Sequence, residues 1–245
     1  RSGLGNIGPE QGDYNQAVKG GGHGNYHSIV LAPASVQEMC DLTMKAFELA
    51  FKYRNPAIVL ADAVLGQMME FLSFPENEAA KPDISGWAVQ GDHRTREHLV
   101  TSIYLDNELQ ERHNWKLQEK YASMSTEAQA ECYQLEDADI VLTGYGTSAR
   151  IARSAVDRLR AEGIKAGLFR PITLFPFPTE QLQKAGLCGR LMVVELSNGQ
   201  YRDDVLLHLD RNVKCSVELI NRMGGNMMKV DDVVERAISM MEVRK

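Results

Sequence analysis

Short apolar runs alternate with amphipathic stretches in the first part of the chain. Residues 28–32 (SIVLA) and 57–61 (AIVLA) predict strands that are apolar on both faces, a pattern typical of parallel sheets covered on two sides. Between them, Ser35 and Glu38 form a capping box, in which a hydroxyl and a carboxylate each accept from an amide at the helix start. Apolar residues then recur at helical spacing until Asn55, which precedes a proline. The pattern predicts a strand, a helix and a second strand.

The same alternation returns in the second half of the chain. A helix is expected over residues 148–162, and a last helix is expected to start at Asp231. Strand–helix alternation favours right-handed crossovers and an open α/β sheet. The strands are expected at residues 140–145, 165–172, 190–196 and 217–221.

The segment between these two units is more polar. Residues 107–134 have helical propensity but carry only a narrow apolar stripe, so they predict a connector helix on the surface. The chain is therefore divided into residues 1–75, a connector at residues 76–136, and residues 137–245. The chain opens in a glycine-rich stretch, and we expect it to be a piece of a longer protein.

Composition narrows the classes of partner. The 245 residues are 44% hydrophobic, and 33 acidic residues outnumber 27 basic ones, giving a formal charge of −6. This balance argues against nucleic acid as a partner, because a nucleic-acid binder needs a basic face. No apolar run approaches the roughly 18 residues of a membrane span, and no secretory leader is visible. We therefore expect a cytoplasmic protein with no membrane partner.

Metal-binding patterns are missing from the sequence. The four cysteines are widely spaced, with no C-x-x-C pair, and the six histidines are scattered. Metal ligands usually occur in close pairs, so no zinc, iron–sulfur or other metal site is expected on this chain. The cysteines lie at positions 40, 132, 188 and 215.

Two glycine-rich turns are candidates for ligand binding. Residues 144–149 (GYGTSA) fit the G-x-G-x-x-A form of a dinucleotide-binding turn, but the acidic residue expected about 20 positions later is absent. The turn either binds no nucleotide or serves NADP, with Arg170 facing the extra phosphate. Residues 19–24 (KGGGHG) lack the Walker spacing and form either a flexible loop or a loop closing over a shared ligand.

Several long segments together resemble one family. The segments resemble the α subunit of 2-oxoacid:ferredoxin oxidoreductases, in particular the 2-ketoisovalerate type, with this chain as the C-terminal portion. The resemblance covers nearly the whole chain. The segments are residues 1–14 (RSGLGNIGPEQGDY), 30–38 (VLAPASVQE), 56–70 (PAIVLADAVLGQMME), 139–152 (DIVLTGYGTSARIA), 169–178 (FRPITLFPFP) and 193–200 (VVELSNGQ).

The resemblance implies a fold and a reaction. The first unit would be the later part of a thiamine-diphosphate pyrimidine-type domain, and the second a transketolase C-terminal-like α/β domain. The complex would decarboxylate a 2-oxo acid on thiamine diphosphate, transfer the acyl group to coenzyme A and pass electrons to ferredoxin. The diphosphate and its Mg²⁺ would lie on a thiamine-binding β subunit. The iron–sulfur clusters would lie on partners, which include γ and ferredoxin-like δ subunits.

The resemblance also implies candidate site residues. Arg1 falls where the family places an arginine that contacts the substrate, and a guanidinium can hold a carboxylate with two parallel hydrogen bonds. Gln11 and Asp13 match the family's Glu-Gln-x-Asp segment near the same site. They either act in the active-site loop or only shape it by hydrogen bonding. No catalytic residue is assigned, because the glutamate that activates thiamine is expected upstream of Arg1.

Two other readings remain open beside the enzyme subunit. Met68, Met69 and Phe71 form a soft apolar stretch, which belongs either to the core or to an interface. In the second case the chain would be a non-catalytic assembly or docking module. The third reading is an NADP-binding domain built on residues 144–149.

Overall fold

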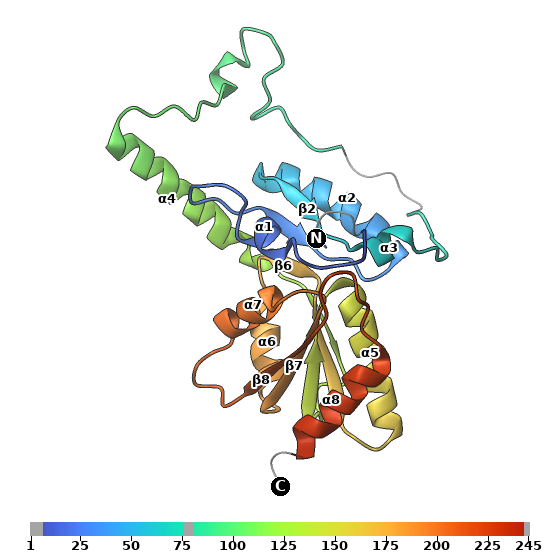
Figure 1. The fold of residues 1–245 in the computed structure, drawn as a ribbon. Coiled ribbons are helices and arrows are strands. Elements are labelled where there is room, and N and C mark those ends of the chain that lie inside the picture. Colours follow the sequence, from blue (N-terminus) through green and yellow to red (C-terminus); the bar gives the residue numbers. More distant parts are fainter. Residues whose placement is uncertain (1–6, 76–80, 243–245) are drawn as a thin grey trace.

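The fold contains two α/β units that each hold one sheet. The computed structural model describes residues 7–75 and 81–242. The smaller sheet has strand order β2-β1-β6 and lies above the larger one, which has order β3-β5-β4-β7-β8 (Figure 1). The strands are β1 (Ile29–Leu31), β2 (Ala57–Val59), β3 (Ala130–Tyr133), β4 (Ile140–Thr143), β5 (Ala166–Pro171), β6 (Thr173–Phe175), β7 (Arg190–Glu195) and β8 (Ser216–Asn221).

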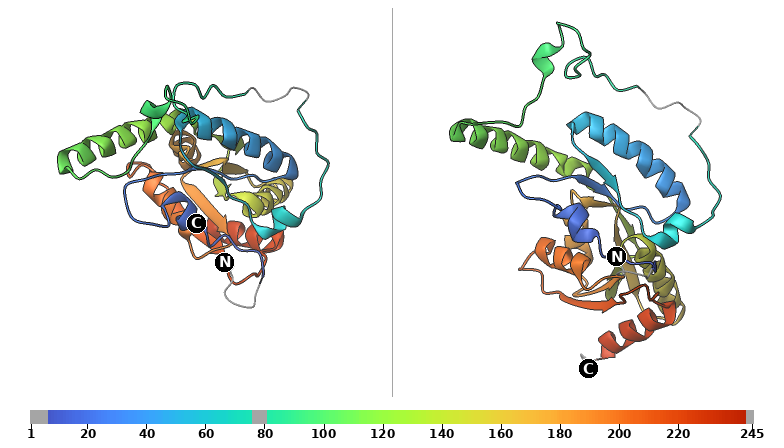
Figure 2. Two further views of the ribbon diagram at one scale, coloured as in Figure 1. Left: turned by 90° about the horizontal axis from the view of Figure 1, so that it is seen from above. Right: turned by 45° about the horizontal axis from the view of Figure 1, so that its top comes forward.

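Helices cover the sheets and connect their strands. The connector helix α4 reaches away from both sheets, as the right-hand view of Figure 2 shows. None of the helices in the two described ranges is long and apolar enough to cross a membrane. The α-helices are α1 (Tyr14–Val18), α2 (Val36–Tyr53), α3 (Ala63–Gln67), α4 (Asn107–Ser123), α5 (Gly146–Ala161), α6 (Thr179–Gly186), α7 (Gln200–His208) and α8 (Val230–Glu242), and short 3-10 turns span Arg96–His98 and Met124–Glu127.

The first unit follows the predicted strand–helix–strand order. β1 and β2 are parallel, and Ile29 and Leu31 pack against α2, while Val30 faces the second unit. The Ser35 hydroxyl accepts from the amide of Glu38 at 3.1 Å. The carboxylate of Glu38 accepts from the amide of Ala34 at 2.7 Å, one residue before the N-cap Ser35, so only the Ser35 half of the capping box satisfies an amide of α2 itself.

The second unit is the predicted α/β sheet with helices on both faces. β4, β5, β7 and β8 are parallel, and α5 and α8 cover one face while α6 and α7 cover the other (Figure 1). The α/β class expected from the sequence is confirmed. Gly163 ends α5 with φ +81°, a conformation that glycine adopts without steric cost.

The predicted connector helix is wrong at its carboxyl end. α4 stops at Ser123, and Ala130–Tyr133 form strand β3, which pairs antiparallel with β5 so that Cys132 lies opposite Phe169. Residues with helical propensity adopt the extended form here because the edge of β5 offers unpaired backbone groups. Tertiary pairing outweighs local preference.

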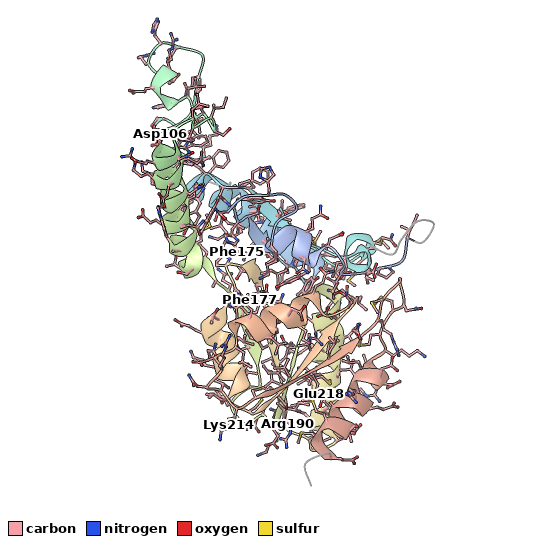
Figure 3. The ribbon with its side chains drawn as sticks, turned by 60° about the vertical axis from the view of Figure 1, so that its left-hand side comes forward. Asp106, Phe175, Phe177, Arg190, Lys214 and Glu218 are labelled. Atoms are coloured by element: carbon pink, nitrogen blue, oxygen red, sulfur yellow. The ribbon has the colours of Figure 1, made fainter. Side chains whose placement is uncertain are left out.

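A short strand from the second half of the chain completes the first sheet. Thr173–Phe175 form β6, which pairs antiparallel with β1 so that Val30 lies opposite Phe175. Phe175 stacks on His27 in the first unit, whereas Phe177 stacks on His208 in the second, each at 4.5 Å between ring centroids. Figure 3 shows these two phenylalanines at the junction of the units. The expected limits at residues 75 and 136 stay a prediction.

Candidate functional site

Gln11 joins the first loop, residues 7–13 before α1, to the larger sheet. Its side-chain amide donates to the carbonyl of Tyr145 at 2.8 Å. Its amide oxygen accepts from the hydroxyl of Ser148 at 2.7 Å and from the amide of Leu196 at 3.0 Å. Gln11 is buried, and its backbone amide donates to the Leu196 carbonyl at 2.8 Å. The side chain is therefore held on both its oxygen and its nitrogen by the second unit.

The glycine turn at residues 144–149 is occupied by a carboxylate of the first unit. Asp62 accepts from the amide of Thr147 at 3.0 Å and from its hydroxyl at 2.6 Å. The same carboxylate caps α3 by accepting from the amides of Val64 and Leu65. The amino end of a helix attracts an anion, and Asp62 supplies that anion from within the chain. At Gly146, a Cβ would lie 3.0 Å from Asp62 Oδ2.

Arg170 is also committed within the protein. It is buried and donates two parallel hydrogen bonds to Glu38, at 2.8 and 2.7 Å, and a third to Glu131 at 2.7 Å. A guanidinium held in this way is saturated with carboxylate partners. The NADP reading assigned Arg170 to a phosphate and the amino end of α5 to a dinucleotide. The geometry disfavours this reading, because Arg170 is taken by Glu38 and Glu131, and the amino end of α5 is taken by Asp62.

A cluster of tyrosines fills the junction beside Gln11. The rings of Tyr14, Tyr145 and Tyr201 pack with centroids 5.5 to 5.8 Å apart. Tyr14 donates its hydroxyl to Asp204 at 2.6 Å, and the hydroxyls of Tyr201 and Thr143 lie 2.5 Å apart. Burial raises the pKa of Tyr14, and Asp204 raises it further. Burial also raises the pKa of Tyr145 and of Tyr201, so all three phenols stay protonated.

The glycine-rich loop at residues 19–24 is anchored at its start. Lys19 forms an ion pair with the buried carboxylate of Asp204 on α7, which is also 3.8 Å from His208 Nε2. Burial lowers the pKa of His208, while Asp204 opposes that shift. The anchor joins a loop of the first unit to a helix of the second.

One cavity lies between this loop and strand β2. It has a volume of about 350 Å³, and its lining includes Asp13, Tyr26, Ser28, Ile58 and Leu60. Asp13 is exposed at the start of α1, where its carboxylate makes no capping hydrogen bond. The cavity therefore combines an apolar wall from β2 with a carboxylate at its rim. Such a surface suits a flat ligand that has both an apolar face and polar edges.

A second cavity lies on the other side of the loop. It measures about 500 Å³, and its lining includes Lys19, His27, Glu111 and Trp115. Within the described part of the chain, His27 Nδ1 is buried and has no hydrogen-bond partner. Burial lowers the pKa of His27, and the charge of Lys19 lowers it further. A neutral imidazole therefore lies beside the loop.

The predicted site residues have different surroundings. Arg1 lies outside the described residues. Gln11 lies in the seam between the units, whereas Asp13 lines the smaller cavity. Sequence reasoning missed Asp62 and Asp204 as residues that hold the loops. Asp62 could have been found from its position, since it follows a buried strand and starts a helix.

Two further features concern metal-binding groups and exposed apolar side chains. Residues 7–75 and 81–242 contain no cluster of three or more His, Cys, Asp or Glu that could hold a metal ion. The cysteines in these ranges are free, and Cys132 is exposed. Met69 and Phe71 are fully exposed, so core packing is the wrong reading for these two residues.

Two family models match the chain, one on each side of residue 137. Residues 2–137 match the model described as "Pyruvate flavodoxin/ferredoxin oxidoreductase, thiamine diP-bdg". The chain belongs to this pyruvate flavodoxin/ferredoxin oxidoreductase family. Residues 138–233 match the model of the pyruvate:ferredoxin oxidoreductase core domain II. The resemblance to 2-oxoacid oxidoreductases is thus confirmed at the level of the family.

Individual oxidoreductase relatives agree with this assignment. The chain is 58% identical to the ketoisovalerate oxidoreductase subunit VorB of Methanothermobacter thermautotrophicus, over 96% of this chain and 66% of the relative. It is 31% identical to the 2-oxoglutarate synthase subunit KorA of Archaeoglobus fulgidus, over 93% of this chain and 66% of that relative. The chain thus spans 66% of the length of these two curated relatives. The names of these relatives do not confirm that the chain is an α subunit.

A solved oxidoreductase structure shares the fold. The 2-oxoglutarate:ferredoxin oxidoreductase from Magnetococcus marinus superposes with a TM-score of 0.75 and 21% sequence identity. The match covers 96% of this chain and 46% of that chain. At this identity the likeness establishes the fold of the two units and nothing finer. The fold of the two units seen here is therefore shared with a solved 2-oxoglutarate:ferredoxin oxidoreductase.

Proposed function

We propose that the chain is part of a subunit of a thiamine-diphosphate-dependent 2-oxoacid:ferredoxin oxidoreductase. The complex converts a branched-chain 2-oxo acid and coenzyme A to acyl-CoA and CO₂, and passes two electrons to ferredoxin. The 58% identity to a ketoisovalerate oxidoreductase subunit is the observation that carries this proposal. An apolar wall formed by Ile58 and Leu60 accords with a branched, apolar substrate or a flat ring near the loop.

The residues of this chain fit one side of the cofactor. Thiamine diphosphate, when bound, supplies the carbanion chemistry and the electron sink that 2-oxo acid decarboxylation requires. The cavity beside Asp13 offers an apolar face to a heteroaromatic ring and a carboxylate to its polar edge. We assign Mg²⁺ and the diphosphate to a partner β subunit, and the iron–sulfur clusters to other partners, as the resemblance to the family implies.

The proposal gives separate roles to residues near the amino terminus. Arg1 grips the carboxylate of the 2-oxo acid with two parallel hydrogen bonds. Asp13 accepts a hydrogen bond at the rim of the cavity, and Gln11 holds the loop against the second unit. Lys19 and Asp204 fix the start of the glycine-rich loop, which lies between the two cavities. The second unit therefore positions the loop.

The proposal includes the surroundings of the subunit. The partners are the β, γ and ferredoxin-like δ subunits, with ferredoxin, coenzyme A and the 2-oxo acid as substrates. We place the complex in the cytoplasm. Neither nucleic acid nor a membrane is a partner in this proposal, and the acidic composition supports the first exclusion.

The reaction class is tested on the native complex. The full-length protein is tagged, purified without oxygen and assayed for viologen reduction in the presence of 2-ketoisovalerate, with and without coenzyme A. We expect reduction that requires both substrates. A complex that contains thiamine diphosphate and all its subunits, yet reduces no viologen, would overturn the proposal in favour of an assembly module.

A further inference from the structure

The side chain of Tyr26 lies between the two cavities that flank the glycine-rich loop. The smaller cavity, of about 350 Å³, is lined by Asp13, Ile58 and Leu60 and is called the Asp13 cavity below. The larger one, of about 500 Å³, reaches Trp115 on α4 and is called the Trp115 cavity. Among the described lining residues, Tyr26 is the one that belongs to both cavities. Its ring therefore forms part of the wall between them.

Glycines surround this ring because a side chain in their place would press against it. A Cβ at Gly20 would lie 3.0 Å from both Cζ and Oη of Tyr26, and Gly20 has φ +98°. The ring would have to give way, and a residue with a Cβ is strained at this φ. A Cβ at Gly24 would also contact the ring, at 3.9 Å from Cδ1. The glycines at residues 19–24 thus have a packing role around one tyrosine.

Two hydrogen bonds hold the ring in this position. The amide of Gly22 donates to the hydroxyl of Tyr26 at 3.0 Å. The carbonyl of Asn25, the residue before Tyr26, accepts from Nε2 of Gln118 on α4 at 3.0 Å. Tyr26 is 38% exposed, so these contacts, rather than packing in the core, set its position. The ring is therefore a fixed wall that belongs to the loop.

The wall limits the Asp13 cavity on one side. A volume of about 350 Å³ is near the lower end of the range of roughly 300–1,000 Å³ that is usual for small-molecule sites. Without the phenol ring, the two cavities would become continuous. A ligand in the Asp13 cavity could then extend toward Trp115, and a side chain larger than an isopropyl group would gain that space.

We infer that Tyr26 sets the upper size of the 2-oxo acid accepted in the Asp13 cavity. The inference rests on the proposed function, in which this cavity lies at the site of the reaction. The side chain of a longer or aromatic 2-oxo acid would meet the phenol ring, whereas a short branched one would not reach it. One methylene more or less in an apolar pocket changes kcat/KM by about 10- to 200-fold, so a wall of this kind is enough to select among 2-oxo acids.

Removal of the ring tests the inference. Tyr26→Ala is made in the full-length protein within the purified complex, and viologen reduction is measured with 2-ketoisovalerate and with phenylpyruvate at saturating coenzyme A. We expect the ratio of kcat/KM for phenylpyruvate to that for 2-ketoisovalerate to rise by about ten-fold or more. A general structural defect lowers both values of kcat/KM together and does not move this ratio.

Two control variants accompany Tyr26→Ala. Tyr26→Phe keeps the ring and loses only the hydroxyl, so the ratio should stay close to that of the native complex. Tyr104→Ala removes a tyrosine that lines neither cavity, and it should also leave the ratio unchanged. An unchanged ratio in Tyr26→Ala, or an equal rise in Tyr104→Ala, would overturn the inference.

The glycines provide a second pair of variants, which decides the question if Tyr26→Ala does not assemble. Gly20→Ala presses on the ring and should raise the ratio. Gly22→Ala is its matched control, because a Cβ there would make an ordinary contact at 3.5 Å from the Tyr26 hydroxyl. Equal ratios in the two variants would contradict the inference. The proposed function would still stand if the native complex uses 2-ketoisovalerate, whereas a native complex that reduces no viologen would overturn both.

Discussion

The carboxylate of Asp62 accepts hydrogen bonds from the amide and the hydroxyl of Thr147, at 3.0 and 2.6 Å, across the junction of the two units. Asp62 is also the N-cap of α3, so one buried side chain serves the amino ends of two helices. The favourable interaction of an anion with these helix ends offsets the cost of burying it. The glycine turn that resembles a dinucleotide site is thereby used to join the units.

Replacing Asp62 should loosen the junction. Asp62→Ala removes the acceptor for the amides of α3 and α5, and we expect the free energy of unfolding to fall by about 2–4 kcal/mol. Chemical denaturation of the full-length protein measures the change. Asp83→Ala is the control, since Asp83 is exposed and bonds only a nearby serine. A loss no larger than that of Asp83→Ala would contradict the role of Asp62.

Substitution of Gln11 should lower stability, whereas substitution of Asp13 should lower activity. Gln11→Ala leaves the Ser148 hydroxyl and the Leu196 amide without their acceptor, so we expect a loss of about 1–3 kcal/mol in stability. Asp13→Asn, on an exposed side chain, should leave stability within about 0.5 kcal/mol but lower kcat/KM. Thermal unfolding and viologen kinetics on the same preparations check both. Unchanged kinetics in Asp13→Asn would remove Asp13 from the site.

Arg1→Ala should weaken use of the 2-oxo acid. Loss of a desolvated carboxylate pair should raise KM and lower kcat/KM. The fall in kcat/KM should correspond to a loss of transition-state stabilisation on the order of 2–5 kcal/mol. Steady-state assays of the full-length complex measure the effect. Arg1→Lys keeps the charge but not the two parallel hydrogen bonds, so it should recover only part of the loss. Kinetics like those of the native complex would exclude Arg1 as the carboxylate ligand.

His27 should make the protein less stable in mild acid. Burial lowers the pKa of His27 below its usual 6.5. As the pH falls, His27 of the unfolded chain therefore binds its proton at a higher pH than His27 of the folded chain does. Its contribution to stability is complete above pH 6.5 and is lost as the pH falls below that value. His27→Phe keeps a ring against Phe175 and should reduce the loss of Tm between pH 7 and 5.

The control for this pH dependence is His93→Phe. His93 is exposed, so the variant should follow the native protein across the same pH range. If His27→Phe and the native protein lose Tm in parallel from pH 7 to 5, the account of His27 is contradicted.

The sequence predicted correctly those helices and strands that depend on residues close together in the chain. The cap at Ser35, the buried strands and the end of the helix predicted over residues 148–162 follow from residues within a few positions of each other. β3 and β6 were missed because their partners lie about 40 to 145 residues away in the chain. No local pattern indicates that Phe175 completes the first sheet.

The candidate site shows the same division. Arg1, Gln11 and Asp13 came from a resemblance of motifs, which identifies positions but not surroundings. Only the folded chain shows that Gln11 is enclosed by the second unit, whereas Asp13 faces a cavity. Asp204 was missed because its partners, Lys19 and Tyr14, are 185 and 190 residues away.

The substrate preference of the complete oxidoreductase tests the central claim most directly. The complex is purified without oxygen, and kcat/KM for viologen reduction is measured with 2-ketoisovalerate, pyruvate and 2-oxoglutarate at saturating coenzyme A. We predict the highest kcat/KM for 2-ketoisovalerate, by at least ten-fold. A higher kcat/KM for pyruvate or 2-oxoglutarate would contradict the assignment to branched-chain 2-oxo acids.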